Sequence, residues 1–213
     1  MKKIFLPLII LLISVISFQS CQTIGNLLNS RYKTASKKDK KENTPLEINL
    51  ASLDKDFLNK EDTNVLFYRI NADILKEVIR KSENKYTLCV SFNLMCNFAV
   101  MKFDSTMQFL KENNINFVVL EPTDWLYQKY TRYFFKQRKY YKPLLTLDLS
   151  KYGYDYDSRR RWRRFIKDLG IENYKDFYVN SEFILFDKDA NIVFAGDFYD
   201  NKDKLKEYLD IKN

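Results

Sequence analysis

The chain of 213 residues carries 36 Lys and Arg against 28 Asp and Glu, a formal net charge of +8, and contains no histidine. Without an imidazole, catalysis by a Ser-His-Asp or Cys-His arrangement and any histidine-ligated metal site are excluded. Aromatic residues make up 16% of the chain and only 4 glycines and 4 prolines occur, which argues against a turn-rich all-β fold. This length accommodates one domain together with an export signal and a tether.

Residues 1–20 have the layout of an export signal. Two lysines give a positive start, residues 4–16 are almost wholly apolar, and Ser20 stands immediately before Cys21. An apolar run of about 13 residues is too short to cross a hydrocarbon core comfortably as a helix. The segment resembles a bacterial lipobox, which implies cleavage before Cys21 and lipid on its thiol and new amino group. An ordinary secretory signal or an N-terminal anchor helix is the alternative.

The lipobox resemblance also implies a location. The mature chain is expected outside the cytoplasm, in the bacterial cell envelope, held to a membrane by acyl chains on Cys21. The next residue is Gln22 and not Asp, which by analogy with many Gram-negative lipoproteins favours the outer membrane, facing the periplasm. We therefore expect the membrane as one partner, an envelope protein as a candidate second partner, and no nucleic acid.

Composition changes along the chain. Residues 31–43 are dominated by Lys, with Ser, Thr, Asp and Glu and almost nothing to bury, so a flexible tether is expected over 21–62. Its lysines could instead rest against anionic headgroups. Residues 45–58 regain apolar side chains and are expected to dock loosely on the domain, which we place at 63–213.

From Val65 onward, strand and helix patterns alternate. Strands are expected at 65–70, 86–92, 115–120 and 143–149, and a hairpin at 183–186 and 192–195. Helices are expected after a cap at Asn71, over 100–110, after Thr123 with Leu126, Tyr130 and Phe134 on one side, from Ser158 to a stop at Gly170, and around Leu205 to Leu209. This order indicates an α/β sandwich with a mixed central sheet flanked by helices.

Two local sequences add a family resemblance. Residues 86–92, Tyr-Thr-Leu-Cys-Val-Ser-Phe, lead into residues 93–100, Asn-Leu-Met-Cys-Asn-Phe-Ala-Val. Together they look like the thioredoxin strand, active-site turn and helix, and residues 183–193 are similar to the hairpin of that family. The order of elements over 64–210 resembles the thioredoxin fold. An insert around 140–169 stands where membrane-anchored, redoxin-type members often carry extra elements.

The resemblance assigns roles to residues of the turn. Cys96 matches the nucleophilic cysteine at a helix N-terminus, where N–H groups and the helix dipole stabilise a thiolate. The turn comprises Met95, Cys96, Asn97, Phe98 and Ala99. Met95 replaces the usual Trp, and Ala99 stands where the resolving cysteine is expected. The cis-proline position falls on Ser181 and the buried acid position near Ser91. These departures argue against dithiol–disulfide exchange.

Two interpretations of Cys96 follow. It acts as a monothiol that forms a sulfenic acid or a mixed disulfide, or it is a buried small hydrophobe. The chain is thus expected to be a membrane-anchored thioredoxin-like lipoprotein with one candidate active-site cysteine. The alternative is a non-catalytic thioredoxin-fold module that binds an envelope partner. No cofactor is expected. Cys89, within the strand, lies too far from Cys96 for a disulfide and is expected in the core.

Residues 159–164, Arg-Arg-Arg-Trp-Arg-Arg, form the densest charge cluster. On a helix, Trp162 joins an inward stripe and the arginines cover the other faces, so a solvated helix face is expected. The alternative is a patch for an anionic partner. Its candidate members are Arg160, Arg163 and Arg164. The tyrosines at 127–141 are expected to form core and margin, with exposed members as a candidate protein-binding surface.

Overall fold

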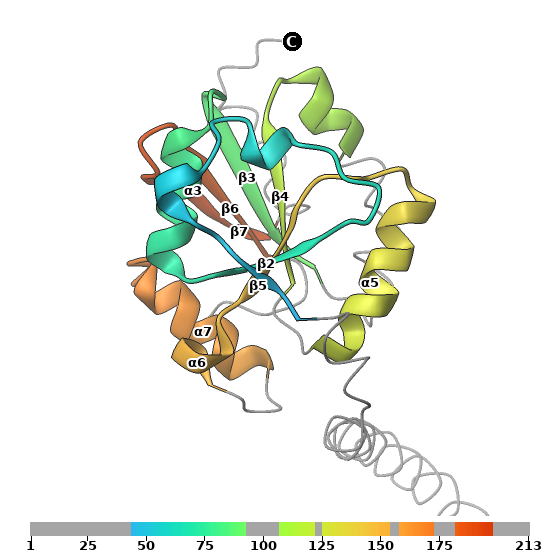
Figure 1. The fold of residues 1–213 in the computed structure, drawn as a ribbon. Helices are drawn as coiled ribbons and strands as arrows, with labels where there is room; N and C mark the ends of the chain where they lie inside the picture. Colours follow the sequence, from blue (N-terminus) through green and yellow to red (C-terminus); the bar gives the residue numbers. More distant parts are fainter. Residues whose placement is uncertain (1–43, 93–106, 122–124, 154–157, 173–181, 198–213) are drawn as a thin grey trace, which may run out of the picture. The chain divides into compact units, whose positions relative to one another are not determined.

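The computed structural model describes residues 44–92, 107–121, 125–153, 158–172 and 182–197. Within these ranges a seven-stranded mixed sheet is covered by helices on both faces, which confirms the predicted α/β fold class (Figure 1). Cys21 and the expected C-terminal helix lie outside the described residues.

The described elements follow the order that the alternating pattern predicts. The strands are β1 (Leu46–Glu47), β2 (Phe67–Ile70), β3 (Tyr86–Ser91), β4 (Asn116–Glu121), β5 (Leu144–Leu147), β6 (Glu182–Asp187) and β7 (Ile192–Asp197). The helices are the 3-10 turns η1 (Leu50–Ser52) and η2 (Phe57–Asn59), then α3 (Ala72–Lys81), α5 (Trp125–Gln137), α6 (Leu149–Tyr152) and α7 (Ser158–Asp168), with a further helical segment at 107–112.

The sheet has the strand order β1-β2-β5-β4-β3-β6-β7. Neighbours from β1 to β3 pair in parallel, whereas β6 pairs antiparallel with both β3 and β7. The predicted insert around 140–169 contains β5, which lies between β2 and β4. The insert is therefore not an appendage, because it supplies an interior strand of the sheet.

Helix α3 begins at the cap that the sequence predicts. The Asn71 side-chain oxygen accepts a hydrogen bond from the Ile74 N–H at 2.9 Å, which satisfies one of the unpaired donors at the helix start. Leu75, Val78 and Ile79 are buried at helical spacing, and Ile74 is only half-buried. The apolar stripe thus turns α3 onto the sheet.

The β6–β7 hairpin is closed by Asp187. Its Oδ1 accepts hydrogen bonds from the N–H groups of Asp189 and Asn191 at 3.0 and 2.8 Å. Ala190 adopts φ 62°, in the left-handed region that tight turns require. The short acceptor side chain adds to the backbone pairing of the turn, in which the Asp187 N–H donates to the Asn191 carbonyl at 3.0 Å. The hairpin expected from the sequence is confirmed.

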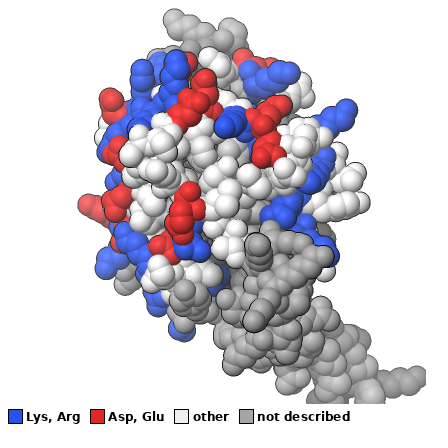
Figure 2. Space-filling view, viewed as in Figure 1, with Lys and Arg blue, Asp and Glu red and all other residues white. Residues whose placement is uncertain are grey.

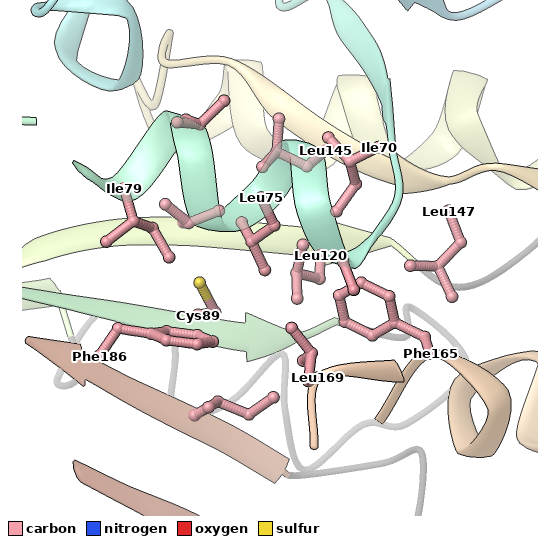
Figure 3. Packing of buried hydrophobic residues seen from close by; sticks show 14 of the residues in the cluster. Ile70, Leu75, Ile79, Cys89, Leu120, Leu145, Leu147, Phe165, Leu169 and Phe186 are labelled. Atoms are coloured by element: carbon pink, nitrogen blue, oxygen red, sulfur yellow. The ribbon is translucent and has the colours of Figure 1, made fainter. Parts of the chain in front are cut away.

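Successive strand residues point to opposite sides, so the sheet separates two apolar cores. One core, shown in Figure 3, packs the strands against α3, α6 and α7 and includes Cys89 and the stripe of Trp162, Phe165, Ile166 and Leu169. The other packs the strands against α5 and the helical segment 107–112. This stripe on α7 is fully buried, as its spacing predicts.

Helix α6 joins the two longer helices of the first core. The buried Tyr152 hydroxyl accepts a hydrogen bond from the Ala72 N–H at 3.0 Å and donates one to Asp168 at 3.1 Å. Burial raises the pKa of this hydroxyl, so it stays protonated and able to donate. One side chain thereby connects the start of α3 with the end of α7.

Residues 44–62, which composition assigns to the tether, pack on the domain. β1 adds a parallel strand beside β2, and Leu58 is buried with 3% of its surface exposed. The Lys81 ammonium donates a hydrogen bond to the Leu50 carbonyl at 2.8 Å. The packed chain therefore begins before residue 63, since the apolar side chains of this segment have a core to join.

Helix α5 faces the sheet differently from the stripe that the sequence suggests. Phe134 is buried, but Tyr130 is 63% exposed and points away from the sheet. The buried side of the helix instead includes Thr131 and Phe135, both with no exposed surface. Gln128 and Thr131 are polar but lie on the inward side of α5. The spacing of apolar residues therefore did not predict which side of the helix is buried.

Candidate functional site

The candidate turn follows β3, an interior strand. Phe92 extends the pairing beyond β3, because its N–H donates to the Leu120 carbonyl at 2.8 Å. Met95, Cys96, Asn97, Phe98, Ala99 and Ser181 lie outside the described residues. After Ser181 the described chain resumes at β6, where Phe183 pairs with Val90. The structure therefore defines the end of β3 that leads to the turn and the start of β6 that follows Ser181.

Phe92 anchors the end of β3 in the core on the α5 side. It is buried, and its ring lies 5.0 Å from that of Phe134 and 4.8 Å from that of Phe135, measured between centroids. Aromatic pairs at such distances contribute beyond their buried area. The point from which the chain leaves for Cys96 is thus held by contacts with α5.

A buried acid stands at the same edge of the sheet. Glu121, the last residue of β4, has no exposed surface, and the Thr131 hydroxyl donates a hydrogen bond to its Oε2 at 2.8 Å. A buried carboxyl group needs such donors, because it has lost its water. The thioredoxin resemblance puts its buried acid position near Ser91. Ser91 is buried on β3, and Glu121 is a buried acid on the neighbouring strand.

Gln128 adds a second buried polar group on α5. It lies three residues before Thr131, so the two share one side of the helix, and only 1% of its surface is exposed. Its Oε1 is buried and has no hydrogen-bond partner among the residues that the structure describes. Buried polar atoms are nearly always paired, which makes this acceptor unusual.

Glu121 lies where the direction of the chain connections changes. The chain leaving β4 enters α5 on one face of the sheet, and the chain leaving β5 enters α6 and α7 on the other. Glu121 pairs with Thr146 of β5 across this boundary. In open α/β sheets, ligand sites favour the carboxyl ends of strands at such a switch point. The sequence signal was an acid that directly continues an apolar strand.

Cys89 is confirmed as a core residue. It has no exposed surface, and Figure 3 places its sulfur among apolar side chains that include Ile79 and Phe186. Burial raises the pKa of the Cys89 thiol, so it stays protonated and a poor nucleophile.

The arginine cluster is only partly a solvated face. Arg160 and Arg164 are exposed and Arg163 is half-buried, but Arg161 is buried with 3% of its surface exposed, contrary to the expectation that all arginines cover outer faces. Arg164 donates a hydrogen bond to the Tyr152 carbonyl at 2.6 Å. Long arginine stems bury readily beside Trp162. Part of the cluster therefore holds α7 against α6.

No family model matches the chain, and comparison with curated proteins and with solved structures gives no significant match. Within the described ranges, no group of three Cys, Asp or Glu side chains is arranged to hold a metal ion. None of the helices in the described part of the chain has the length and apolar character needed to cross a bilayer.

Replacing Thr131 with Val should lower the free energy of unfolding by about 1–3 kcal/mol, because the buried Glu121 carboxyl loses a donor while the side-chain volume is nearly kept. Urea denaturation measures the change. The control is Tyr133→Ser on the exposed side of α5, which should alter stability by at most about 0.5 kcal/mol. Equal effects of the two changes would contradict the assigned hydrogen bond.

Proposed function

We propose that this chain is a membrane-anchored, thioredoxin-like lipoprotein of the cell envelope, related to the thiol–disulfide oxidoreductases, in which Cys96 is a single nucleophilic thiol. One observation carries the proposal. β3, which leads towards Cys96, pairs in parallel with β4 and antiparallel with β6, and the buried Glu121 stands at the same edge. An interior strand that leads towards a cysteine at this edge of the sheet agrees with the local sequence resemblance to thioredoxin.

Chain length supports a site shared by the two segments. Cys96 follows Phe92 by four residues, so it lies within about 14 Å of Phe92. Ser181 precedes Phe183 by two residues, so it lies within about 7 Å of Phe183. Since Phe183 pairs with Val90, the chain leaves towards Cys96 and returns from Ser181 at the same end of β3.

The residues present favour monothiol chemistry. The Cys96 thiolate attacks one sulfur of a disulfide, the S–S bond breaks, and the second sulfur leaves as a thiolate. The product is a mixed disulfide on Cys96. Because Ala99 carries no thiol, an external thiol must attack this mixed disulfide to release reduced Cys96 and complete a cycle.

The envelope location is supported by the lipobox resemblance at Cys21. Lipid on that cysteine would hold the domain to a membrane through residues 22–43, whose lysine-rich composition suits a solvated segment. A non-catalytic binding module is the second candidate. It is favoured by Ala99, which leaves the turn without a resolving thiol.

The reactivity of Cys96 is tested with the full chain and a disulfide reagent such as oxidised glutathione. Mass spectrometry should find a mixed disulfide on Cys96 in the native protein, and none on Cys89, whose thiol is buried. The Cys96→Ser variant should lose the adduct and Cys89→Ala should keep it. Insulin-type disulfides should not be turned over unless thiol is added.

Two results would contradict the monothiol role. Turnover without added thiol would show a complete dithiol cycle, which Ala99 cannot support. A Cys96 as inert as Cys89 in the folded protein would leave the binding module as the function. Ala99→Cys is the matched gain-of-function variant, since it places a second thiol three residues after Cys96.

Lipidation is tested by growing bacteria that express the full chain with a labelled fatty acid. The wild-type chain should carry the label and lose residues 1–20, and Cys21→Ser should abolish both, because the acylated thiol is absent. The Cys96→Ser variant is the control and should remain labelled. A wild-type chain without label would overturn the lipoprotein assignment and favour an ordinary secretory signal or an anchor helix, and label that persists in Cys21→Ser would show that Cys21 is not the lipid site.

A further inference from the structure

Helix α5 presents an exposed side that combines tyrosines with lysines. This α5 outer face consists of Lys129, Tyr130, Tyr133, Lys136 and Gln137. Tyr130 and Tyr133 are 63% and 65% exposed, and with Leu46 they are the large hydrophobic residues most exposed among those described. In the described part of the chain, none of the five side chains has a hydrogen bond or an ion pair. Exposed aromatic residues next to one another indicate an interaction surface.

The charged residues of α5 and of the chain from α5 to β5 have one sign. From Trp125 to Leu147 the chain has six Lys and Arg residues and no Asp or Glu. Acids contact this stretch beyond the C-terminal end of the helix, where the Asp62 N–H donates to the Tyr141 carbonyl at 2.8 Å. In Figure 2 the side chains over α5 are blue or white, whereas blue and red alternate over much of the rest of the view. The face is therefore complementary to an anionic surface.

The core holds this face in place. Phe134 and Phe135 bury the opposite side of α5, and the Arg132 guanidinium donates a hydrogen bond to the Val65 carbonyl at 3.1 Å. Arg132 is thus engaged with the domain, while the exposed Lys129 and the half-buried Lys136 lie on either side of Tyr133 along the helix. A rigid helix therefore presents both lysines together, without an ordering step on binding.

We propose that the α5 outer face docks the domain on an anionic lipid surface. Tyrosine rings prefer the headgroup region, where the ring is apolar and the hydroxyl stays wet, and lysines beside them attract lipid phosphates. The inference rests on the proposed envelope location, which supplies the membrane, but not on the chemistry of Cys96.

The tether alone does not select a face. Residues 22–43 span up to about 75 Å when extended, so a domain held at Cys21 is able to turn any side to the bilayer. The selection must come from the surface itself. Among the described exposed residues, the α5 outer face brings together two exposed tyrosines and two lysines without a neighbouring acid on its helix.

The test is lysine footprinting of the full chain on vesicles. One set contains phosphatidylcholine alone and the other contains phosphatidylglycerol as well. A membrane-impermeant acylating reagent labels exposed amines, and mass spectrometry reads each lysine. Lys129 and Lys136 should lose labelling on the anionic vesicles, because amines held against lipid phosphates are shielded from the reagent. Lys188, on the β6–β7 turn, should be labelled equally on both.

Matched variants separate docking from unfolding and from net charge. Tyr130→Ser with Tyr133→Ser alters only exposed side chains and should abolish the protection of both lysines. Lys55→Gln with Lys188→Gln removes two positive charges elsewhere and should leave the protection intact.

Equal labelling on both vesicles would overturn the proposal. Protection by a soluble polyanion such as heparin, but not by anionic vesicles, would also overturn it and assign the face to a different partner. Failure of the Cys96 or Cys21 experiments leaves these outcomes unchanged, because neither cysteine contributes to the contact that is measured.

Discussion

The pairing of β3 on both of its edges is the constraint on which the rest of the structure depends. β4 lies along one edge in parallel and β6 along the other, antiparallel. Leu88 and Cys89 face opposite cores, and both are fully buried. A slip of one residue would exchange the two faces, so burial on both sides fixes the register. Whatever follows Phe92 therefore leaves the sheet at a determined point.

The second determinant is the position of β5. Because β5 lies between β2 and β4, the connections from β4 and β5 go to opposite faces of the sheet. Their carboxyl ends bring Glu121 and Thr146 together, with Thr131 above the acid. The same arrangement places α5 over one face, where its inward side covers this edge and its outward side carries the exposed tyrosines. The proposed thiol site and the proposed lipid-docking face thus share one helix.

Local sequence patterns predicted the helices, strands and turns well, because these elements depend on residues that are close together in the chain. The Asn71 cap, the buried stripe of α7 and the β6–β7 turn are all confirmed. Strand order was not predicted. The alternation of apolar and polar residues shows which side chains of a strand are buried, but it does not show which strands are neighbours in the sheet. The burial of Arg161 and Glu121 was missed for a similar reason. Each is polar in sequence, and only the surrounding fold supplies the groups that make burial tolerable.

The packing of residues 44–62 shows the same limit of local reasoning. Leu58 and Phe57 form a short apolar pair between polar residues, but the core that Leu58 enters is formed by α3 and the sheet, which are distant in sequence. The site itself was predicted by resemblance at Cys96 and Ser181, whereas Glu121 emerged only from strand pairing. The sequence thus predicts a chemistry for the turn, and the fold shows the polar groups at the strand ends beside it.

The account depends most directly on β5 being the strand between β2 and β4. Nuclear Overhauser contacts in the isotope-labelled chain test this order. The structure pairs Leu145 with Tyr68 on one side and with Leu120 on the other, so cross-strand contacts should join Leu145 to both. Direct backbone contacts between Tyr68 and Leu120, with Leu145 outside the sheet, would contradict the order and remove the switch point at Glu121.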